Sequence, residues 1–280
     1  MAEIWASWAS GVKMTNFSKF FALCLPLSIL ASQTQAAEAP FKEPLRVNNI
    51  FIPQEGFDDN DNIQFVLDGE LKNACLQVGS SSVTFDGHII DVKLEARRNE
   101  DTFCAQEDAL LPEAIQATVP FHKEVEIGQL KAGDYTIRFQ TATATVTQNF
   151  KVDVAPTDRQ DSLNYAPVDN ASVDSLINIG ESVKIRLTGM LTSSCMHLRD
   201  EVLTSKEGDV VVIQPLVKVD LSSKCLMYLR PFTKDIEVPN LSKGRYMIHV
   251  RSMNGHALNR VFSVCSSTGD GHCTSLNRDR

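Results

Sequence analysis

Cysteine is the residue type in this 280-residue chain whose number and spacing most directly suggest chemistry. Of the seven cysteines, Cys24 lies inside an apolar N-terminal stretch, and six others remain: Cys75, Cys104, Cys195, Cys225, Cys265 and Cys273. None of them forms the CxxC pair that is typical of a zinc site or a thioredoxin-like redox centre. An even number of well-separated cysteines in an exported chain indicates disulfide bonds.

An acidic segment, DDNDN at residues 58–62, gathers oxygen ligands of the kind that calcium prefers. It resembles the D-x-N-D-N signature of cadherin-type linkers, except that Gln64 stands where that pattern continues to a proline. Asp and Asn are also common turn residues because their side chains hydrogen-bond to the nearby backbone. We therefore expect a turn and no cofactor, with Asp58, Asp59 and Asp61 as weak candidate calcium ligands.

No enzyme signature occurs in the sequence. The patterns G-x-S-x-G and H-E-x-x-H and the phosphate-binding P-loop are absent. The six histidines are scattered, and alternation places His249 on the outward face of its predicted strand, where we expect it to be solvent-exposed. Ser193-Ser194-Cys195 suggests a nucleophile, but a cysteine in a disulfide has no thiolate. We therefore expect no catalytic residue and no enzymatic activity.

The elements that must position these residues repeat along the chain. The alternating segment at 63–69 (IQFVLDG) recurs at 183–189 (VKIRLTG). A second motif, L-x-x-G-x-Y-x-I-x-(F/V), occurs at 130–139 and again at 241–250. A repeat of this length indicates tandem domains and excludes a short-period solenoid.

The same repeat predicts the disulfide pairing. Cys75 and Cys195 each follow the glycine of the first motif by six residues, and the next cysteines, Cys104 and Cys225, follow after 29 and 30 residues. Two copies with cysteines at matching positions should fold alike, so each copy should pair within itself. The last two cysteines have no counterpart and lie close enough to close a small loop. The predicted pairs are Cys75–Cys104, Cys195–Cys225 and Cys265–Cys273.

Each copy is predicted to be a β-sandwich. The apolar segments are short, alternate with a period of two, and are separated by clusters of Gly, Asn, Asp and Ser. In the second motif, Tyr135, Ile137 and Phe139 share one face of a strand, and glycine before the strand suits a tight turn.

The second motif resembles the end of immunoglobulin-like and fibronectin-III-like modules. More narrowly, GELKNAC at 69–75, CAQ at 104–106 and LKAGDY at 130–135 resemble a repeat of secreted bacterial proteins of uncharacterised role. The second copy departs from it after both Cys195 and Cys225. The resemblance implies an all-β chain of two tandem antiparallel immunoglobulin-like β-sandwiches, each with an internal disulfide. It carries no catalytic residue.

The N-terminus has the pattern of a secretory signal peptide: lysines, an apolar stretch at 20–31 and a small-residue exit, with cleavage expected after Ala36 or Ala37. Both tryptophans, Trp5 and Trp8, precede that point. No other stretch reaches the length of a transmembrane segment. The predicted organisation is a signal peptide at 1–36, a first β-sandwich at 44–154, a linker at 155–167, a second β-sandwich at 168–266 and a C-terminal tail at 267–280.

The formal charge of −8 argues against nucleic-acid binding and against a polybasic membrane contact. The charge is uneven, with a net −10 over residues 37–156 and +1 over residues 157–280. The leading hypothesis is a non-catalytic exported protein, periplasmic or extracellular, that binds another protein or a cell-envelope component through its sandwich surfaces or edge strands. The alternatives are a periplasmic assembly factor or inhibitor, and a small-ligand or calcium-binding module.

Overall fold

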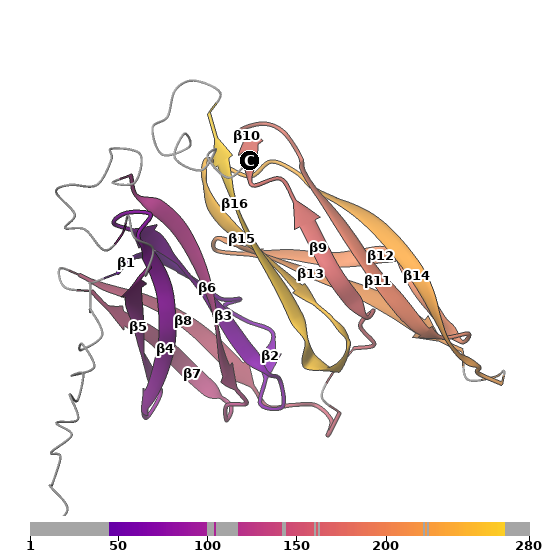
Figure 1. The fold of residues 1–280 in the computed structure, drawn as a ribbon. Helices are drawn as coiled ribbons and strands as arrows, with labels where there is room; N and C mark the ends of the chain where they lie inside the picture. Colours follow the sequence, from indigo (N-terminus) through magenta and orange to yellow (C-terminus); the bar gives the residue numbers. More distant parts are fainter. Residues whose placement is uncertain are drawn as a thin grey trace, which may run out of the picture. The chain divides into compact units, whose positions relative to one another are not determined.

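The computed structural model describes residues 45–99, 104, 117–141, 144–159, 161, 163–220, 222 and 224–266. Sixteen β-strands in these ranges form four sheets (Figure 1). A 3-10 turn at Met253–Gly255 connects the last two strands of the chain. The same ranges contain no α-helix. The predicted all-β class is therefore confirmed, with two sheets and one disulfide in each half.

The first sandwich has a three-stranded sheet and a five-stranded sheet that enclose one apolar core. The three-stranded sheet has the order β1 (Arg46–Phe51), β3 (Ile63–Leu71) and β6 (Val119–Gly128). The five-stranded sheet has the order β2 (Phe57–Asp58), β8 (Thr145–Asp153), β7 (Gly133–Gln140), β5 (Ile89–Arg98) and β4 (Leu76–Asp86).

The second sandwich repeats this topology strand for strand around its own core. Its three-stranded sheet has the order β14 (Met227–Val238), β11 (Val183–Ser193) and β9 (Val168–Val173). Its five-stranded sheet has the order β10 (Leu176–Asn178), β16 (Ala257–Cys265), β15 (Gly244–Arg251), β13 (Val210–Val219) and β12 (Met196–Glu207).

Most neighbouring strands are antiparallel, but each sandwich also contains two parallel pairs. These are β2–β8 and β5–β7 in the first sandwich, and β10–β16 and β13–β15 in the second. A parallel pair needs a crossover connection. Between β5 and β7 this crossover is β6, and between β13 and β15 it is β14, each of which lies in the opposite sheet.

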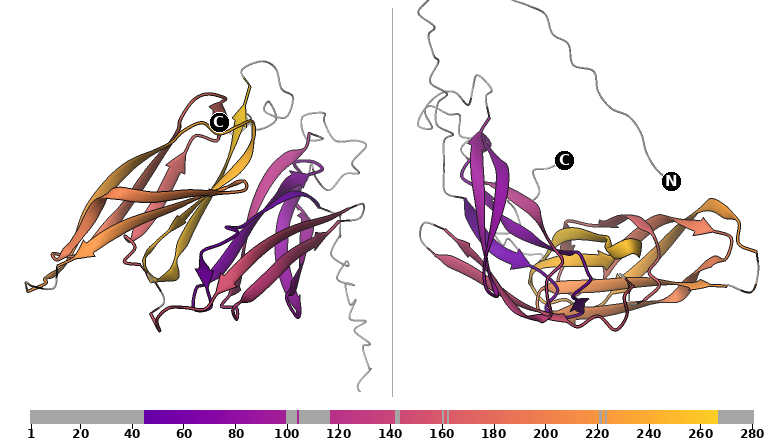
Figure 2. Two further views of the ribbon diagram at one scale, coloured as in Figure 1. Left: turned by 180° about the vertical axis from the view of Figure 1, so that it is seen from behind. Right: turned by 90° about the horizontal axis from the view of Figure 1, so that it is seen from below.

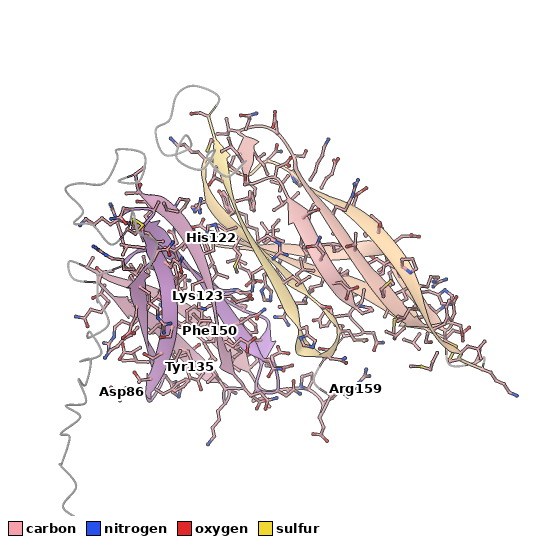
Figure 3. All side chains as sticks on the ribbon, in the orientation of Figure 1. Asp86, His122, Lys123, Tyr135, Phe150 and Arg159 are labelled. Atoms are coloured by element: carbon pink, nitrogen blue, oxygen red, sulfur yellow. A yellow bond between two sulfur atoms is a disulfide. The ribbon has the colours of Figure 1, made fainter. Side chains whose placement is uncertain are left out.

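The repeated tyrosine motif has a structural explanation in both copies. The hydroxyl of Tyr135 donates a hydrogen bond to the backbone oxygen of Lys131 at 2.9 Å, and the hydroxyl of Tyr246 donates to that of Ser242 at 3.0 Å. This is the bond of the tyrosine corner of immunoglobulin-like sandwiches. Tyr135 also stacks on Phe150 inside the first sandwich, with ring centroids 5.6 Å apart (Figure 3). The tyrosine thus ties the turn before the strand to the core.

Glycine is required where the first motif ends, because another strand passes too close for a side chain. A Cβ on Gly69 would lie 2.1 Å from the backbone oxygen of Arg46 and 2.9 Å from the ring of Phe121. At Gly189 the backbone oxygen of Pro167 would be 2.1 Å away, and a phenylalanine ring of β14 occupies the other side. The repeated glycine therefore marks the same close approach of two chain segments in both sandwiches.

Cys75 pairs with Cys104, and Cys195 pairs with Cys225, as the repeat predicts. In each copy the backbone N–H of the first cysteine donates a hydrogen bond to the side chain two residues earlier. The acceptor is Asn73 for Cys75 and Ser193 for Cys195. Cys265 ends β16 and is buried, whereas Cys273 lies outside the described residues. The Cys265–Cys273 pair and the tail at 267–280 stay predictions.

The later part of the predicted linker packs onto the second sandwich. Tyr165 and Ala166 are buried, and the backbone N–H of Ala166 donates to the oxygen of Pro215 at 2.7 Å. Ala166 belongs to the core cluster of the second sandwich. The exposed part of the connection is therefore shorter than the predicted 155–167 segment, within the residues that the structure describes.

Candidate functional site

The acidic segment forms the turn between β2 and β3, and its side chains bind the chain that leads to the second sandwich. Asp59 Oδ1 accepts a hydrogen bond from the backbone N–H of Ala155 at 2.9 Å. Asn60 Nδ2 donates to the backbone oxygens of Thr157 and Arg159 at 3.1 and 2.9 Å. The turn therefore fixes the start of the connection between the two sandwiches.

The same turn receives a cationic side chain from the second sandwich. The guanidinium of Arg251 lies 3.5 Å from Asp61 Oδ2, donates to the backbone oxygen of Gly56, and lies over the ring of Phe57 at 5.2 Å. Burial raises the pKa of Asp61, while the charge of Arg251 and the hydrogen bond from the Asp58 N–H act in the opposite direction. The positive charge of Arg251 thus already lies near the carboxylates of Asp58 and Asp61. Calcium binding by Asp58, Asp59 and Asp61 stays a hypothesis, and no group of three or more His, Cys, Asp or Glu suited to a metal occurs in the described ranges.

Apolar side chains on the outer faces of two sheets form a third cluster, which we call the junction. Phe51 and Val66 come from the three-stranded sheet of the first sandwich, and Val210, Val212 and Met247 come from the five-stranded sheet of the second. All five are buried, Met247 completely. The two sandwiches therefore share apolar packing in addition to the covalent connection.

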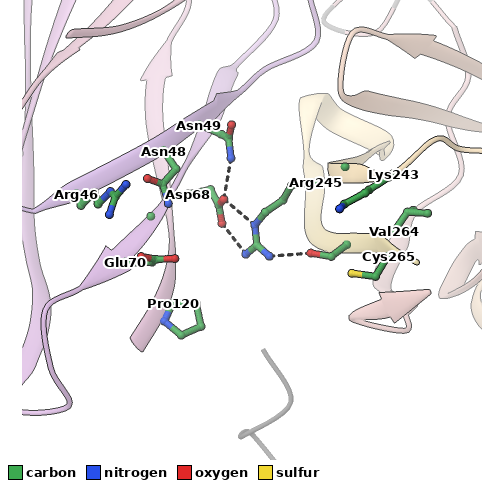
Figure 4. Close-up of a pocket in the computed structure, with 13 residues that line it drawn as sticks. Arg46, Asn48, Asn49, Asp68, Glu70, Pro120, Lys243, Arg245, Val264 and Cys265 are labelled. Atoms are coloured by element: carbon green, nitrogen blue, oxygen red, sulfur yellow. Dashed lines mark hydrogen bonds and ion pairs between the residues drawn. The ribbon is translucent and has the colours of Figure 1, made fainter. Parts of the chain in front are cut away.

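A buried ion pair lies beside the junction cluster (Figure 4). The guanidinium of Arg245 donates two hydrogen bonds to the carboxylate of Asp68, both 2.7 Å long, and a third to Ser263 Oγ at 2.9 Å. The side chain of Asp68 is 3% exposed and also contacts His122 Nδ1 at 2.8 Å and Asn49 Nδ2 at 3.1 Å. Burial alone would raise the pKa of Asp68, but its hydrogen bonds with His122, Arg245 and Asn49 and the charge of Arg245 outweigh burial and lower it.

A cleft of about 360 Å³ opens next to this pair (Figure 4). Its lining carries charges of both signs, including Arg46, Glu70 and Lys243, together with the Asp68–Arg245 pair. The carboxylate of Asp68 is already bound by groups of the chain itself.

The most distinctive surface feature lies at the tip of the second sandwich, where β14 begins (Figure 2). Four consecutive apolar residues are exposed there: Leu226 (69%), Met227 (85%), Tyr228 (48%) and Leu229 (63%). We call Leu226–Leu229 the apolar tip. Sequence reasoning missed this site, because an apolar run after a disulfide-bonded cysteine is typical of a buried strand.

The apolar tip is held in place by the neighbouring chain. Cys225, just before it, is bonded to Cys195 at the end of the adjacent hairpin. The backbone N–H of Ser194 donates to the oxygen of Leu226, and the N–H of Leu226 donates to Ser194 Oγ, both at 2.9 Å. Arg230, just after the tip, donates to a backbone oxygen of β12 at 2.8 Å. Covalent and hydrogen bonds therefore fix both ends of the exposed run.

The family model described as the ORF11 beta-sandwich domain matches residues 65–152 and 185–264, which together make up more than half of the chain. The chain belongs to the ORF11 beta-sandwich domain family. The two matched segments are the two copies of the repeat, and each contains its glycine, its tyrosine and both cysteines of its disulfide. Comparison with curated proteins gives no match, and comparison with solved structures gives none either. No helix in the described part of the chain is long and apolar enough to cross a membrane.

The prediction that His249 is solvent-exposed is wrong. In the second ORF11 beta-sandwich domain it does lie on the outward face of β15, but the first domain covers that face, and His249 is 1% exposed. Its Nδ1 atom is 2.8 Å from Asn259 Oδ1, and its ring packs edge-on against Phe57. Burial lowers the pKa of His249 to about 3, helped by the charge of Arg251 and opposed by the hydrogen bond with Asn259.

The buried His249 is expected to make the two-domain unit acid-sensitive. Its pKa is about 3 when folded and about 6.5 when unfolded, so the unfolded chain binds more protons below pH 6.5. The contribution of His249 to the free energy of unfolding should be complete above pH 6.5. From pH 6.5 down to pH 3 the free energy of unfolding should fall by about 1.4 kcal/mol per pH unit. Urea unfolding should therefore show a loss of about 2 kcal/mol between pH 8 and pH 5.

The variant His249→Gln is the control for this titration. Between pH 8 and pH 5 the variant should lack the loss of about 2 kcal/mol expected of the wild type, because it has no imidazole at position 249 to titrate. Parallel losses of stability in the wild type and the variant would contradict the assignment to His249.

Proposed function

We propose that this protein is a non-catalytic, exported binding protein whose second ORF11 beta-sandwich domain presents the apolar tip to a macromolecular partner. The observation that carries the proposal is the exposure of four consecutive apolar residues, Leu226–Leu229. Contiguous exposed apolar side chains are costly in water and mark interaction sites in soluble domains. The partner is another protein or a component of the cell envelope.

The construction of the tip supports this role. The Cys195–Cys225 bond and the two hydrogen bonds between Ser194 and Leu226 order the run before any partner arrives. Preorganisation reduces the entropy that is lost on binding. The junction adds rigidity, because its apolar side chains pack the first sandwich against the second.

The chemistry of the remaining residues supports a non-catalytic, exported protein. Disulfides persist in oxidising compartments, and the N-terminal signal pattern directs a chain to such a compartment. The cysteine in the nucleophile-like segment Ser193–Cys195 is bonded to another sulfur, which removes the thiolate. A periplasmic assembly factor or inhibitor would use the same tip toward a client protein.

Binding of the exported chain to the envelope fraction of its source cell tests this proposal. The double variant Met227→Ser/Leu229→Ser should lower retention by at least about 10-fold, since each serine removes most of the favourable burial of one large apolar side chain. Phe85→Ser/Val154→Ser is the matched control, because both side chains are exposed and lie in the first sandwich. Equal retention of the two double variants would refute the proposal.

A further inference from the structure

All four side chains of the apolar tip are exposed, at the irregular start of strand β14. The register of β14 against β11 shifts here, between the pairs Ser193–Met227 and Leu191–Arg230, so Met227, Tyr228 and Leu229 lie at a β-bulge. All three remain exposed, together with Leu226. A groove on a partner protein covers one face of a strand, whereas a fluid apolar phase surrounds the whole projection. The exposure of four consecutive apolar side chains therefore favours a bilayer as the partner.

Basic side chains flank the tip. Lys224 precedes it and Arg230 follows it, while His197 and Lys218 form a cross-strand pair at the same end of the neighbouring hairpin. An acidic side chain, Asp220, also lies near Lys218 and His197, and its pKa is lowered by hydrogen bonds from Ser222 and by the charges of these two residues. The overall charge of −8 conceals this feature, because residues 37–156 carry the acidic excess. The local charge is complementary to anionic headgroups.

The backbone limits how deep the tip can go. Strand β14 is the edge of its sheet, so the outer N–H and C=O groups of Met227–Leu229 have no neighbouring strand. Unpaired backbone groups are not tolerated in the hydrocarbon core. Insertion must stop at the headgroup boundary, where water remains and where tyrosine side chains such as Tyr228 are favoured.

We infer that the partner of the apolar tip is the surface of an anionic lipid bilayer, into whose headgroup region Leu226–Leu229 inserts. The inference rests on the proposed function and names the partner of the same site. It assigns Met227 and Leu229 to apolar anchoring, Tyr228 to the interface, and Lys218, Lys224 and Arg230 to the headgroups.

Tryptophan fluorescence gives a direct test, because both tryptophans of the chain, Trp5 and Trp8, lie within the predicted signal peptide. In the exported chain the variant Tyr228→Trp carries one reporter at the tip, and Phe85→Trp carries one at an exposed position of the first sandwich. With vesicles of phosphatidylcholine and phosphatidylglycerol, the emission of Tyr228→Trp should shift to the blue and be quenched by brominated lipids. The emission of Phe85→Trp should not change.

Sedimentation with the same vesicles measures the contributions of the side chains. Met227→Ser/Leu229→Ser should weaken binding roughly 100-fold, and Phe85→Ser/Val154→Ser should leave it unchanged. Lys218→Gln/Lys224→Gln should weaken binding roughly 20-fold, and Lys93→Gln/Lys184→Gln should not. Added salt and neutral vesicles should both reduce binding by the wild type. Unchanged melting temperatures of the variants show that folding is intact.

Two results would overturn the inference in different ways. If Tyr228→Trp ignores anionic vesicles while Met227→Ser/Leu229→Ser still abolishes retention by the envelope fraction, the partner is a protein and the proposed function stands. If the tip substitutions change neither vesicle binding nor envelope retention, the inference and the proposed function both fail.

Discussion

Replacing Arg245 with methionine is expected to lower the free energy of unfolding by about 3–5 kcal/mol, the range for breaking a buried ion pair by removing one partner. The carboxylate of Asp68, 3% exposed, would keep only His122 and Asn49 as partners. The methionine side chain retains most of the packing, so the change isolates the lost charge and hydrogen bonds. Urea unfolding at pH 7 and constant salt measures the effect.

The chain contains a matched control for this prediction. Arg186 and Asp235 form a comparable two-bond pair on the outer face of the second sandwich, but their side chains are 62% and 65% exposed. Water screens an exposed pair, so Arg186→Met should have little effect on the free energy of unfolding. Combining Arg245→Met with Asp68→Leu should restore part of the loss, because no buried charge is then left unpaired. Similar losses for Arg245→Met and Arg186→Met would show that the buried pair has no special role.

The sequence predicted what the two copies share. The alternating segments, the glycine, the tyrosine and the two disulfides recur at matching positions, and each is fixed by contacts within one sandwich. Local pattern and tertiary structure therefore agree for these features. The parallel pairing of β5 with β7 and of β13 with β15 was not predicted, because strand order leaves no trace in the alternation of single strands.

The junction escaped prediction because it depends on how the two copies differ. Val66 in the first copy corresponds to Arg186 in the second, and Met247 in the second corresponds to Thr136 in the first. In each pair the apolar member lies in the buried junction and the polar member does not. One apolar residue at an outward position is common in solvated sheets, so each substitution alone carries little information. The misplacement of His249 has the same origin.

The apolar tip escaped prediction for the opposite reason. Four apolar residues in a row indicate burial, and nothing local to Leu226–Leu229 shows that β14 begins beyond the end of the core. The tip lies at the end of the sheet, beyond the residues of β11 that pair with β9. Only the tertiary structure carries that information.

Removing either long disulfide is expected to lower the free energy of unfolding by about 3.6 kcal/mol, since the chain-entropy estimate depends on loop length and the loops span 29 and 30 residues. The double variants Cys75→Ser/Cys104→Ser and Cys195→Ser/Cys225→Ser leave no free thiol at the broken bridge. If the two sandwiches folded independently, each loss would stay within its own sandwich. The junction changes that expectation, because unfolding the first sandwich exposes Met247 to water. Hydrogen exchange of β13 and β15 should therefore quicken in the Cys75→Ser/Cys104→Ser variant, together with that of β3. Unchanged protection of β13 and β15, with loss confined to the first sandwich, would show that the junction does not couple the folding of the two domains.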